Sequence, residues 1–329
     1  MDLLRKIQEL GDSKRISKEI AKIFSGFYES YRAAVLDNKD DFHTQIPLLN
    51  HLLDFVIDQY ENPFHFECYH KKIVKPFDYY QFGLDFIRPL VKLDQSTLTG
   101  KERIAEIESA LMRKENVILF SNHQTEPDPQ AISLLLEKEH PALAQNMIFV
   151  AGHRVTTDPL AVPFSKGRNL LCIYSKNYIE HPPEKKLEKV HHNQKTMKKM
   201  RELLSEGGYC IYVAPSGGRD RRNPKGIIEV APFDPQSIEM FWFTANHSSR
   251  PTHFYPLALS TFDLLPPPEG INITLGEKRH AKSSPIHLAF GQEIQMDKFP
   301  GSVNEDKKER RILRANFIWN IVNELYSSL

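Results

Sequence analysis

Residues 117–129, with the sequence VILFSNHQTEPDP, decide the kind of fold that this chain adopts. Four apolar residues suit a buried strand, and a polar turn then leads into a helix-like segment, Pro129–Lys138. A second helix-like segment is Lys195–Leu204. Apolar runs of strand length recur at Ile148–Ala151, Leu170–Tyr174, Tyr209–Ala214, Phe254–Leu259 and Ile271–Leu275. Buried strands that alternate with helices predict an α/β fold with a mixed, largely parallel sheet flanked by helices.

Residues 1–60 have a different pattern, typical of helices. Apolar side chains recur at three- and four-residue steps in two stripes, one at Ile16, Ile20, Ile23, Phe27, Tyr31 and Ala34, the other at Leu49, Leu52, Leu53, Val56 and Tyr60. A chain of 329 residues is also long for a single core. We therefore expect a small N-terminal helical bundle over residues 1–75 and a larger α/β domain over residues 76–329.

The composition excludes several classes of protein. A net charge of +1 argues against a nucleic-acid binder, since such proteins carry a large basic excess. No stretch approaches the roughly 18 apolar residues of a membrane span. The cysteines, Cys68, Cys172 and Cys210, are scattered, as in a reducing compartment. The N-terminus lacks the pattern of a signal or transit peptide. We expect a soluble cytoplasmic protein with at most peripheral membrane contact.

The turn after the first strand holds a histidine and an aspartate five residues apart, His123 and Asp128. An imidazole can accept a proton from a hydroxyl near neutral pH, and a carboxylate on its other nitrogen fixes the tautomer and stabilises the imidazolium. His153 and Asp158 repeat this spacing after the next strand. The spacing alone therefore leaves two candidate pairs, and either can also be a turn histidine capped by an aspartate.

A turn of small residues and arginines follows the strand-like segment Tyr209–Ala214, with the sequence PSGGRDRR at residues 215–222. Glycines let the backbone approach a ligand, and guanidinium groups can fork onto phosphate oxygens. The P-loop pattern is absent. The turn predicts a phosphate site, with an exposed basic turn as the alternative.

Four blocks of the sequence, taken in order, resemble the glycerolipid acyltransferases. They are NHQTEPD (122–128), IFVAGHR (148–154), APSGGRDR (214–221) and HFYPLAL (253–259). The wording of the second and third blocks, and of PFSKGRNL (163–170), is similar to the soluble, plastid and chlamydial type of glycerol-3-phosphate 1-acyltransferase. That family has a small helical bundle before a larger α/β domain, so the resemblance agrees with the fold predicted from the residues. In a plastid member the compartment would be the stroma.

The resemblance implies roles for the marked residues. His123 would be the general base that takes the proton from the 1-hydroxyl of glycerol 3-phosphate, and Asp128 would orient it. The oxygen would attack the acyl thioester directly, giving 1-acylglycerol 3-phosphate, the first step of phospholipid synthesis. Arg219 and Arg221 carry over as phosphate ligands, with Lys176 as a third. Backbone N–H groups would stabilise the oxyanion.

The chain departs from the plant pattern beside Lys176. Plant members continue the Tyr-Ser-Lys run with Lys-His, whereas this chain has Asn177-Tyr178. An amide and a phenol can still hydrogen-bond a phosphate, but one or two positive charges are missing. The phosphate shell around Lys176 is where this chain differs from its family.

The resemblance also implies an acyl carrier protein thioester as donor, with acyl-CoA as the alternative, and no cofactor. Acyl carrier proteins are acidic, so the basic segment around Lys185–Arg201 is a candidate docking face, with an ordinary solvated helix face as the other interpretation. No metal is expected, because neither the cluster of His65, Cys68 and His70 nor the pair His191-His192 has a recognised ligand framework.

Three alternatives stay open at this point. An enzyme that acylates 1-acylglycerol 3-phosphate would have a membrane-resident substrate, and no apolar anchor is visible. A serine hydrolase is disfavoured because G-x-S-x-G is absent and Ser216 precedes two glycines. A non-catalytic module that binds phosphate or nucleic acid through Arg219, Arg221 and Arg222 would leave His123 and Asp128 without a role.

Overall fold

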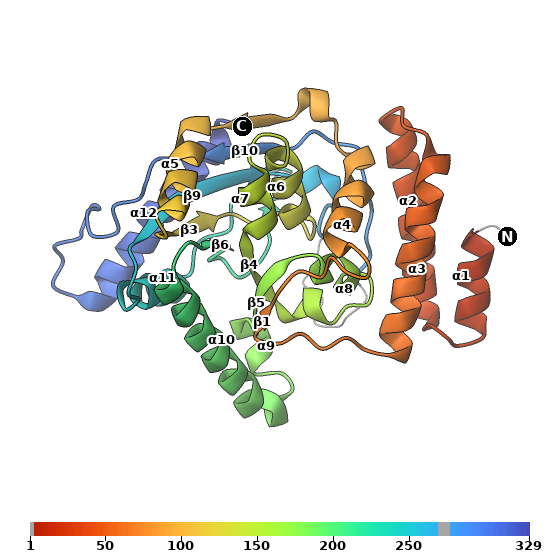
Figure 1. Ribbon diagram of the computed structural model, residues 1–329, viewed down its shortest axis with the longest axis horizontal. Helices are drawn as coiled ribbons and strands as arrows, with labels where there is room; N and C mark the ends of the chain where they lie inside the picture. The colour runs from red at the N-terminus through yellow and green to blue at the C-terminus, as the bar shows by residue number, and fades with distance from the viewer. Residues whose placement is uncertain (1–2, 269–276) are drawn as a thin grey trace.

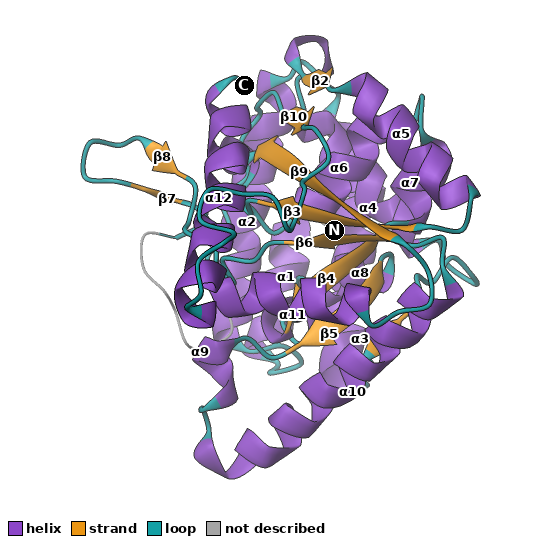
Figure 2. Ribbon diagram, turned by 90° about the vertical axis from the view of Figure 1, so that its left-hand side faces the viewer, coloured by secondary structure: helices purple, strands orange, loops and turns teal. Residues whose placement is uncertain are grey.

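A computed structural model describes residues 3–268 and 277–329, without the side chains of Lys176 and Asn177. Its centre is an eight-stranded sheet in the order β1-β5-β4-β6-β3-β9-β10-β2 (Figures 1 and 2). The strands are β1 Tyr69–His70, β2 Thr97–Thr99, β3 Asn116–Ser121, β4 Ile148–Gly152, β5 Asn169–Ile173, β6 Cys210–Val213, β9 Thr252–Ser260 and β10 His287–Phe290. All pairs are parallel except β1 with β5 and β9 with β10, so the prediction of a mixed, largely parallel sheet is confirmed.

Five of the six predicted strands form within two residues of the expected bounds, as β3, β4, β5, β6 and β9. The sixth, Ile271–Leu275, lies outside the described residues. Three strands of the sheet were not predicted, namely β1, β2 and β10, which are two to four residues long. Runs this short are below the length at which an apolar pattern separates strand from loop. A separate hairpin, β7 Arg221–Arg222 with β8 Ile228–Glu229, extends from the arginine turn.

Helices cover both faces of the sheet because β3 alternates its side chains between two cores. Ile118 and Phe120 pack with α10 Lys186–Glu206, α11 Pro235–Asn246 and α12 Lys307–Ser327. Val117 and Leu119 pack with α5 Lys101–Met112, α6 Asp128–Leu136 and α7 Pro141–Asn146. Strands buried on both faces need this three-layer arrangement. The helix-like segment Pro129–Lys138 corresponds to α6, and the segment Lys195–Leu204 lies in the C-terminal half of α10, which begins nine residues earlier than predicted.

The N-terminal segment is helical, as predicted. It forms α1 Leu3–Asp12, α2 Lys18–Asp37 and α3 Ile46–Glu61, which lie side by side (Figure 1). Ser17 caps α2 by accepting a hydrogen bond from the Ile20 N–H at 3.1 Å. The next helices are α4 Tyr79–Ile87, α8 Val162–Lys166 and α9 Lys176–Ile179, and short 3-10 turns lie at Phe42–Gln45, Arg88–Leu90, Leu93–Gln95, His153–Thr156, Pro183–Lys185 and Phe262–Leu264.

One apolar cluster joins the N-terminal helices to later parts of the chain. Phe27 of α2 and Leu52 of α3 belong to it, together with Phe86 of α4, Leu134 of α6 and Leu264. The domain boundary at residues 75 and 76 stays a prediction. Within residues 3–268 and 277–329, no helix combines the length and apolar character that crossing a bilayer requires.

Candidate active site

The polar blocks of the sequence meet at one edge of the sheet. Parallel strands β3, β6 and β9 lie next to one another, so the segments that leave their carboxyl ends converge (Figure 2). His123 follows β3, Arg219 follows β6, and Thr261 follows β9. The loops after strands in such a sheet are where function gathers, which agrees with the position of the predicted residues.

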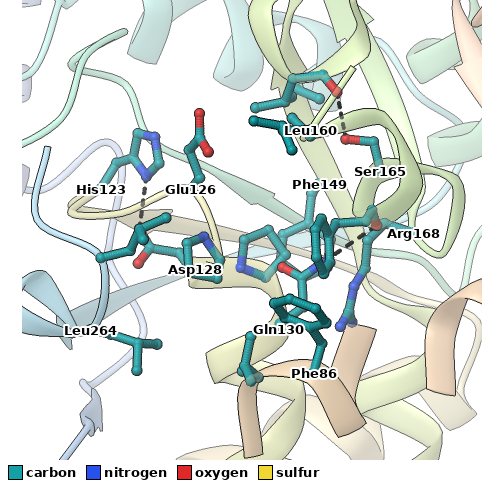
Figure 3. A pocket seen from close by; sticks show the side chains of 18 of the residues that line it. Phe86, His123, Glu126, Asp128, Gln130, Phe149, Leu160, Ser165, Arg168 and Leu264 are labelled. Atoms are coloured by element: carbon teal, nitrogen blue, oxygen red, sulfur yellow. Dashed lines mark hydrogen bonds and ion pairs between the residues drawn. The ribbon is translucent and has the colours of Figure 1, made fainter. Parts of the chain in front are cut away.

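His123 and Asp128 form a hydrogen-bonded pair. The Nδ1 atom of His123 lies 2.7 Å from Oδ2 of Asp128 (Figure 3). The carboxylate is fully buried, while 31% of the histidine side chain is exposed. Asp128 also accepts hydrogen bonds from the Gln124 N–H at 2.8 Å and from the Thr261 hydroxyl at 2.6 Å. These contacts fix the carboxylate, so Nδ1 carries a hydrogen and Nε2 is left as the proton acceptor.

The second candidate pair is not assembled. Asp158 caps the Leu160 N–H at 2.9 Å and forms an ion pair with Arg279 at 3.1 Å. The Nδ1 atom of His153 instead contacts the Thr157 hydroxyl at 3.1 Å, and burial lowers the pKa of His153. The repeated spacing thus yields a histidine–carboxylate pair only at His123.

A narrow apolar pocket of about 170 Å³ lies beside His123 (Figure 3). Its wall combines residues of the N-terminal helices, the segment around α8 and the sheet, among them Phe27, Leu52, Phe86, Leu90, Phe149, Val150, Leu160, Phe164 and Leu264. Such a wall suits an aliphatic chain. A histidine with Nε2 as a proton acceptor, at the side of an apolar pocket, is an arrangement that can bring a hydroxyl to an aliphatic substrate.

The arginines of the predicted phosphate site lie together but are engaged with protein groups. Nη2 of Arg219 contacts both carboxylate oxygens of Glu277 at 2.6 and 2.7 Å, and Arg154 contacts the same carboxylate at 2.8 Å. Arg221 donates to the carbonyl of Pro268 at 2.6 Å. Burial, and then the neighbouring Arg219, lower the pKa of Arg221. The site therefore concentrates positive charge with one carboxylate inside it.

Lys176 is the first residue of α9, directly after the loop that leaves β5. Its side chain lies outside the described part of the chain, so the contact with phosphate implied for it stays a prediction. The Tyr178 hydroxyl, at a position where the chain departs from the plant pattern, lies 3.4 Å from Nη1 of Arg154.

Residues 95–260 match the Acyltransferase family, half of the chain and all four sequence blocks. The whole chain aligns with chloroplastic glycerol-3-phosphate acyltransferases. It is 39% identical to ATS12 of Cucurbita moschata, 38% to the Spinacia oleracea protein and 36% to that of Arabidopsis thaliana, covering 71%, 70% and 72% of their lengths. The chain belongs to the glycerol-3-phosphate acyltransferases.

This acyltransferase also superimposes on the solved 1-acyl-sn-glycerophosphate (LPA) acyltransferase PlsC of Thermotoga maritima, with a TM-score of 0.41 and 14% identity, over 76% of this chain and 78% of that one. A similarity of that size carries no weight for function.

Glu126 and Arg279 are among the charged residues near His123 that were not singled out in the sequence. Arg279 is buried and contacts Glu126 at 2.7 and 3.0 Å as well as Asp158. Both Glu126 and Arg279 line the apolar pocket near His123. Glu126 lies within the first sequence block, NHQTEPD, so the sequence itself could have identified it. Arg279 lies in a segment without a motif, and only the fold brings it to the site.

A buried polar network ties the blocks of the acyltransferase together. The Asn122 side chain donates to Asp220 at 2.8 Å and accepts from the Leu259 N–H at 2.8 Å. Gln124 donates to Asp220 at 3.1 Å and accepts from the Thr261 N–H at 2.7 Å. Burial raises the pKa of Asp220 to about 6. This network explains why amides flank His123 and why an aspartate separates Arg219 from Arg221.

Two histidines of the metal-like clusters, His70 and His192, contact backbone carbonyl groups. Nε2 of His70 lies 3.1 Å from the carbonyl of Lys166, and Nε2 of His192 lies 2.9 Å from that of Cys172. Within the described residues, no group of three or more side chains is arranged to hold a metal ion.

Proposed function

We propose that this acyltransferase moves an acyl group from a thioester to the 1-hydroxyl of glycerol 3-phosphate, with His123 as general base and Asp128 as its orienting partner. The observation that carries the proposal is the 2.7 Å hydrogen bond between His123 Nδ1 and a fully buried carboxylate, at the side of an apolar pocket. Nε2 is thereby held as a proton acceptor beside a place for the acyl chain.

The reaction needs no covalent acyl-enzyme. His123 Nε2 takes the hydroxyl proton as the oxygen attacks the thioester carbonyl, and the C–O bond forms. The tetrahedral oxyanion then collapses, the C–S bond breaks, and the departing sulfur takes the proton back from the imidazolium. The charge on Asp128 stabilises the imidazolium between these two steps. General-base catalysis of this kind contributes about 10²–10⁴-fold.

Arg219 and Arg221 would bind the substrate phosphate, with Lys176 as a third ligand and Arg154 as an addition from the fold. Arg219 uses only Nη2 for Glu277, so its other N–H groups can form charge-assisted hydrogen bonds with phosphate. The three guanidinium groups and the carboxylate of Glu277 give a local charge of +2, and Lys176 would raise it to +3, so the site is cationic enough to bind a phosphate dianion.

The acyl donor would be an acyl carrier protein thioester, with acyl-CoA as the alternative. Helix α10 supports this proposal, because Lys195, Lys198 and Arg201 are exposed in its second half. A basic face steers an acidic partner. Reversing the charges of Lys195 and Lys198 should raise the Michaelis constant for the carrier-protein donor only. An equal effect on acyl-CoA, or none on either donor, would refute this docking face.

The test of the catalytic proposal compares His123→Ala with His153→Ala in a thioester-to-glycerol 3-phosphate transfer assay. The first change should lower kcat by about 10²-fold or more. The second is the matched control, since His153 has the same spacing to an aspartate but no contact with it, and kcat should stay near wild type. If wild type transferred no acyl group from any donor, the proposal that it catalyses this reaction would be refuted. If kcat fell equally in both variants, the assignment of His123 as the general base would be refuted.

A further inference from the structure

Arg168, between α8 and β5, is a buried arginine without an acidic partner among the described residues. Only 3% of it is exposed. Its Nη1 donates to the Ser133 hydroxyl at 2.5 Å, and the guanidinium carbon lies 4.7 Å from the centre of the Tyr80 ring and 6.0 Å from that of Phe149. Its Nε and Nη2 atoms are buried without a hydrogen bond of normal geometry, and the further polar group that acts on the guanidinium is the neutral Tyr80 hydroxyl.

Such an environment is unfavourable for a charge. Burial lowers the pKa of Arg168 to about 10, which still leaves the guanidinium protonated at neutral pH. Arg279 is also buried, with 9% of it exposed, but it has two carboxylate partners, Glu126 and Asp158. A buried charge is normally paired, because desolvation without compensation destabilises the fold. Stability alone therefore does not account for an arginine at position 168.

The position of Arg168 suggests what it does. It lines the same apolar pocket as His123, and Figure 3 shows it on the opposite side of that pocket. The aromatic rings of Phe86, Phe149 and Phe164 belong to the pocket wall, and all three are apolar surface for an aliphatic chain. A chain that starts at a thioester beside His123 and crosses the pocket therefore runs toward the side chain of Arg168.

We propose that Arg168 is a specificity-determining residue, whose guanidinium ends the apolar pocket and so limits the length of the acyl chain. The inference rests on the proposed function, in which this pocket holds the acyl chain. Along the apolar wall each further methylene adds binding energy. A methylene group that reaches Arg168 instead lies against a positive charge that it cannot solvate. Longer acyl chains therefore gain no further binding energy, or must displace the Arg168 side chain.

The test uses Arg168→Met and Arg168→Lys, because methionine and lysine have similar length and volume and differ in charge. The quantity measured is kcat/KM for acyl-CoA donors of increasing chain length. We compare kcat/KM for a donor two carbons longer than the wild-type optimum with kcat/KM for the optimum donor itself. This ratio should be about 15-fold higher in the Met variant than in wild type. This follows from about fourfold per buried methylene, or ~0.8 kcal/mol. The Lys variant should keep the wild-type profile.

Thermal unfolding of the same proteins gives a second readout. Because Arg168→Met removes an unpaired buried charge, its Tm should equal or exceed that of wild type and exceed that of Arg168→Lys. Equal lengthening in both variants would show that volume matters and charge does not. An unchanged profile in the Met variant, or failure of that variant to fold, would each overturn the proposal.

Failure of the proposed function can be told apart from failure of this inference. If wild type transfers no acyl group, binding is compared in place of kcat/KM. The measurement is the rise in Tm that each acyl-CoA produces in wild type, Arg168→Met and Arg168→Lys. A longer preferred chain in Arg168→Met then supports the pocket limit without catalysis. The same preferred chain in all three proteins refutes it.

Discussion

Replacing Asp128 with asparagine tests the catalytic pair without emptying the site. An asparagine amide can keep its oxygen toward His123 and the Gln124 N–H if its NH₂ group faces Thr261, whose hydroxyl can turn to accept. The histidine tautomer then survives, and the main loss is the negative charge that stabilises the imidazolium. Two unit charges about 4 Å apart interact by about 4 kcal/mol at an effective dielectric constant of about 20.

This value is an upper limit for the effect on the barrier. A lower limit is the difference of about 1.4 kcal/mol between a charge-assisted and a neutral hydrogen bond. Since about 1.4 kcal/mol is a factor of ten, kcat should fall about 10- to 1,000-fold. The Michaelis constant for glycerol 3-phosphate should change little, since the Asp128 side chain is fully buried and is not one of the proposed phosphate ligands.

The assay is steady-state kinetics of wild type, Asp128→Asn, His123→Ala and the double variant, with circular dichroism to follow folding. Because the two residues act as one unit, the double variant should be no slower than His123→Ala. A further loss of 10-fold or more in the double variant would refute the reasoning. So would a single Asp128→Asn variant with wild-type kcat and an unchanged Tm.

Three further predictions concern the rest of the site. Arg219→Gln should raise the Michaelis constant for glycerol 3-phosphate about 10- to 100-fold, because a charged hydrogen bond to the phosphate is lost. The control Arg222→Gln changes an exposed ion pair and should alter this constant by no more than about twofold. Similar Michaelis constants for the two variants in a kinetic assay would remove Arg219 from the phosphate site. Burial raises the pKa of Asp220 from 3.8 to about 6, so between these pH values the native state holds a proton that the unfolded chain has released. As the pH rises from about 4 to about 6, wild type should therefore lose up to ~3 kcal/mol of unfolding free energy relative to Asp220→Asn. A constant difference between the two proteins in denaturant titrations across this pH range would contradict the prediction. Gly167→Ala would put a Cβ atom 2.3 Å from the carbonyl oxygen of Tyr79, at the start of α4, and should destabilise the fold by about 2 kcal/mol or more, which lowers Tm. In the control Gly152→Ala the new Cβ atom meets nothing within 4 Å, so Tm should stay unchanged.

The sheet, and the closeness of His123 to Asp128, were predictable from the sequence because both depend on local patterns. Each of the five central strands is a short apolar run, and His123 with Asp128 sits in the turn directly after one of them. The resemblance to a known family then separated this pair from His153 and Asp158, which spacing alone could not do.

The remaining features depend on contacts between distant parts of the chain. Arg279 meets Glu126 across 153 positions, and Arg219 meets Glu277 across 58. Strand β10 forms because β9 and β2 offer partners on both sides, although its four residues are too few for a periodic signal. The unpaired state of Arg168 is invisible in sequence, since it is defined by what fails to lie near it.

The buried network of Asn122, Gln124, Asp220 and Thr261 bears on how the protein responds to heat. It links the segments that follow three adjacent strands, so it opens only when those strands separate. The edge of the sheet that carries His123 should then unfold together with the rest of the sheet, as one cooperative unit. Warming should therefore abolish transfer and folding at the same temperature, leaving no interval in which a loosened centre admits water and wastes acyl thioester by hydrolysis.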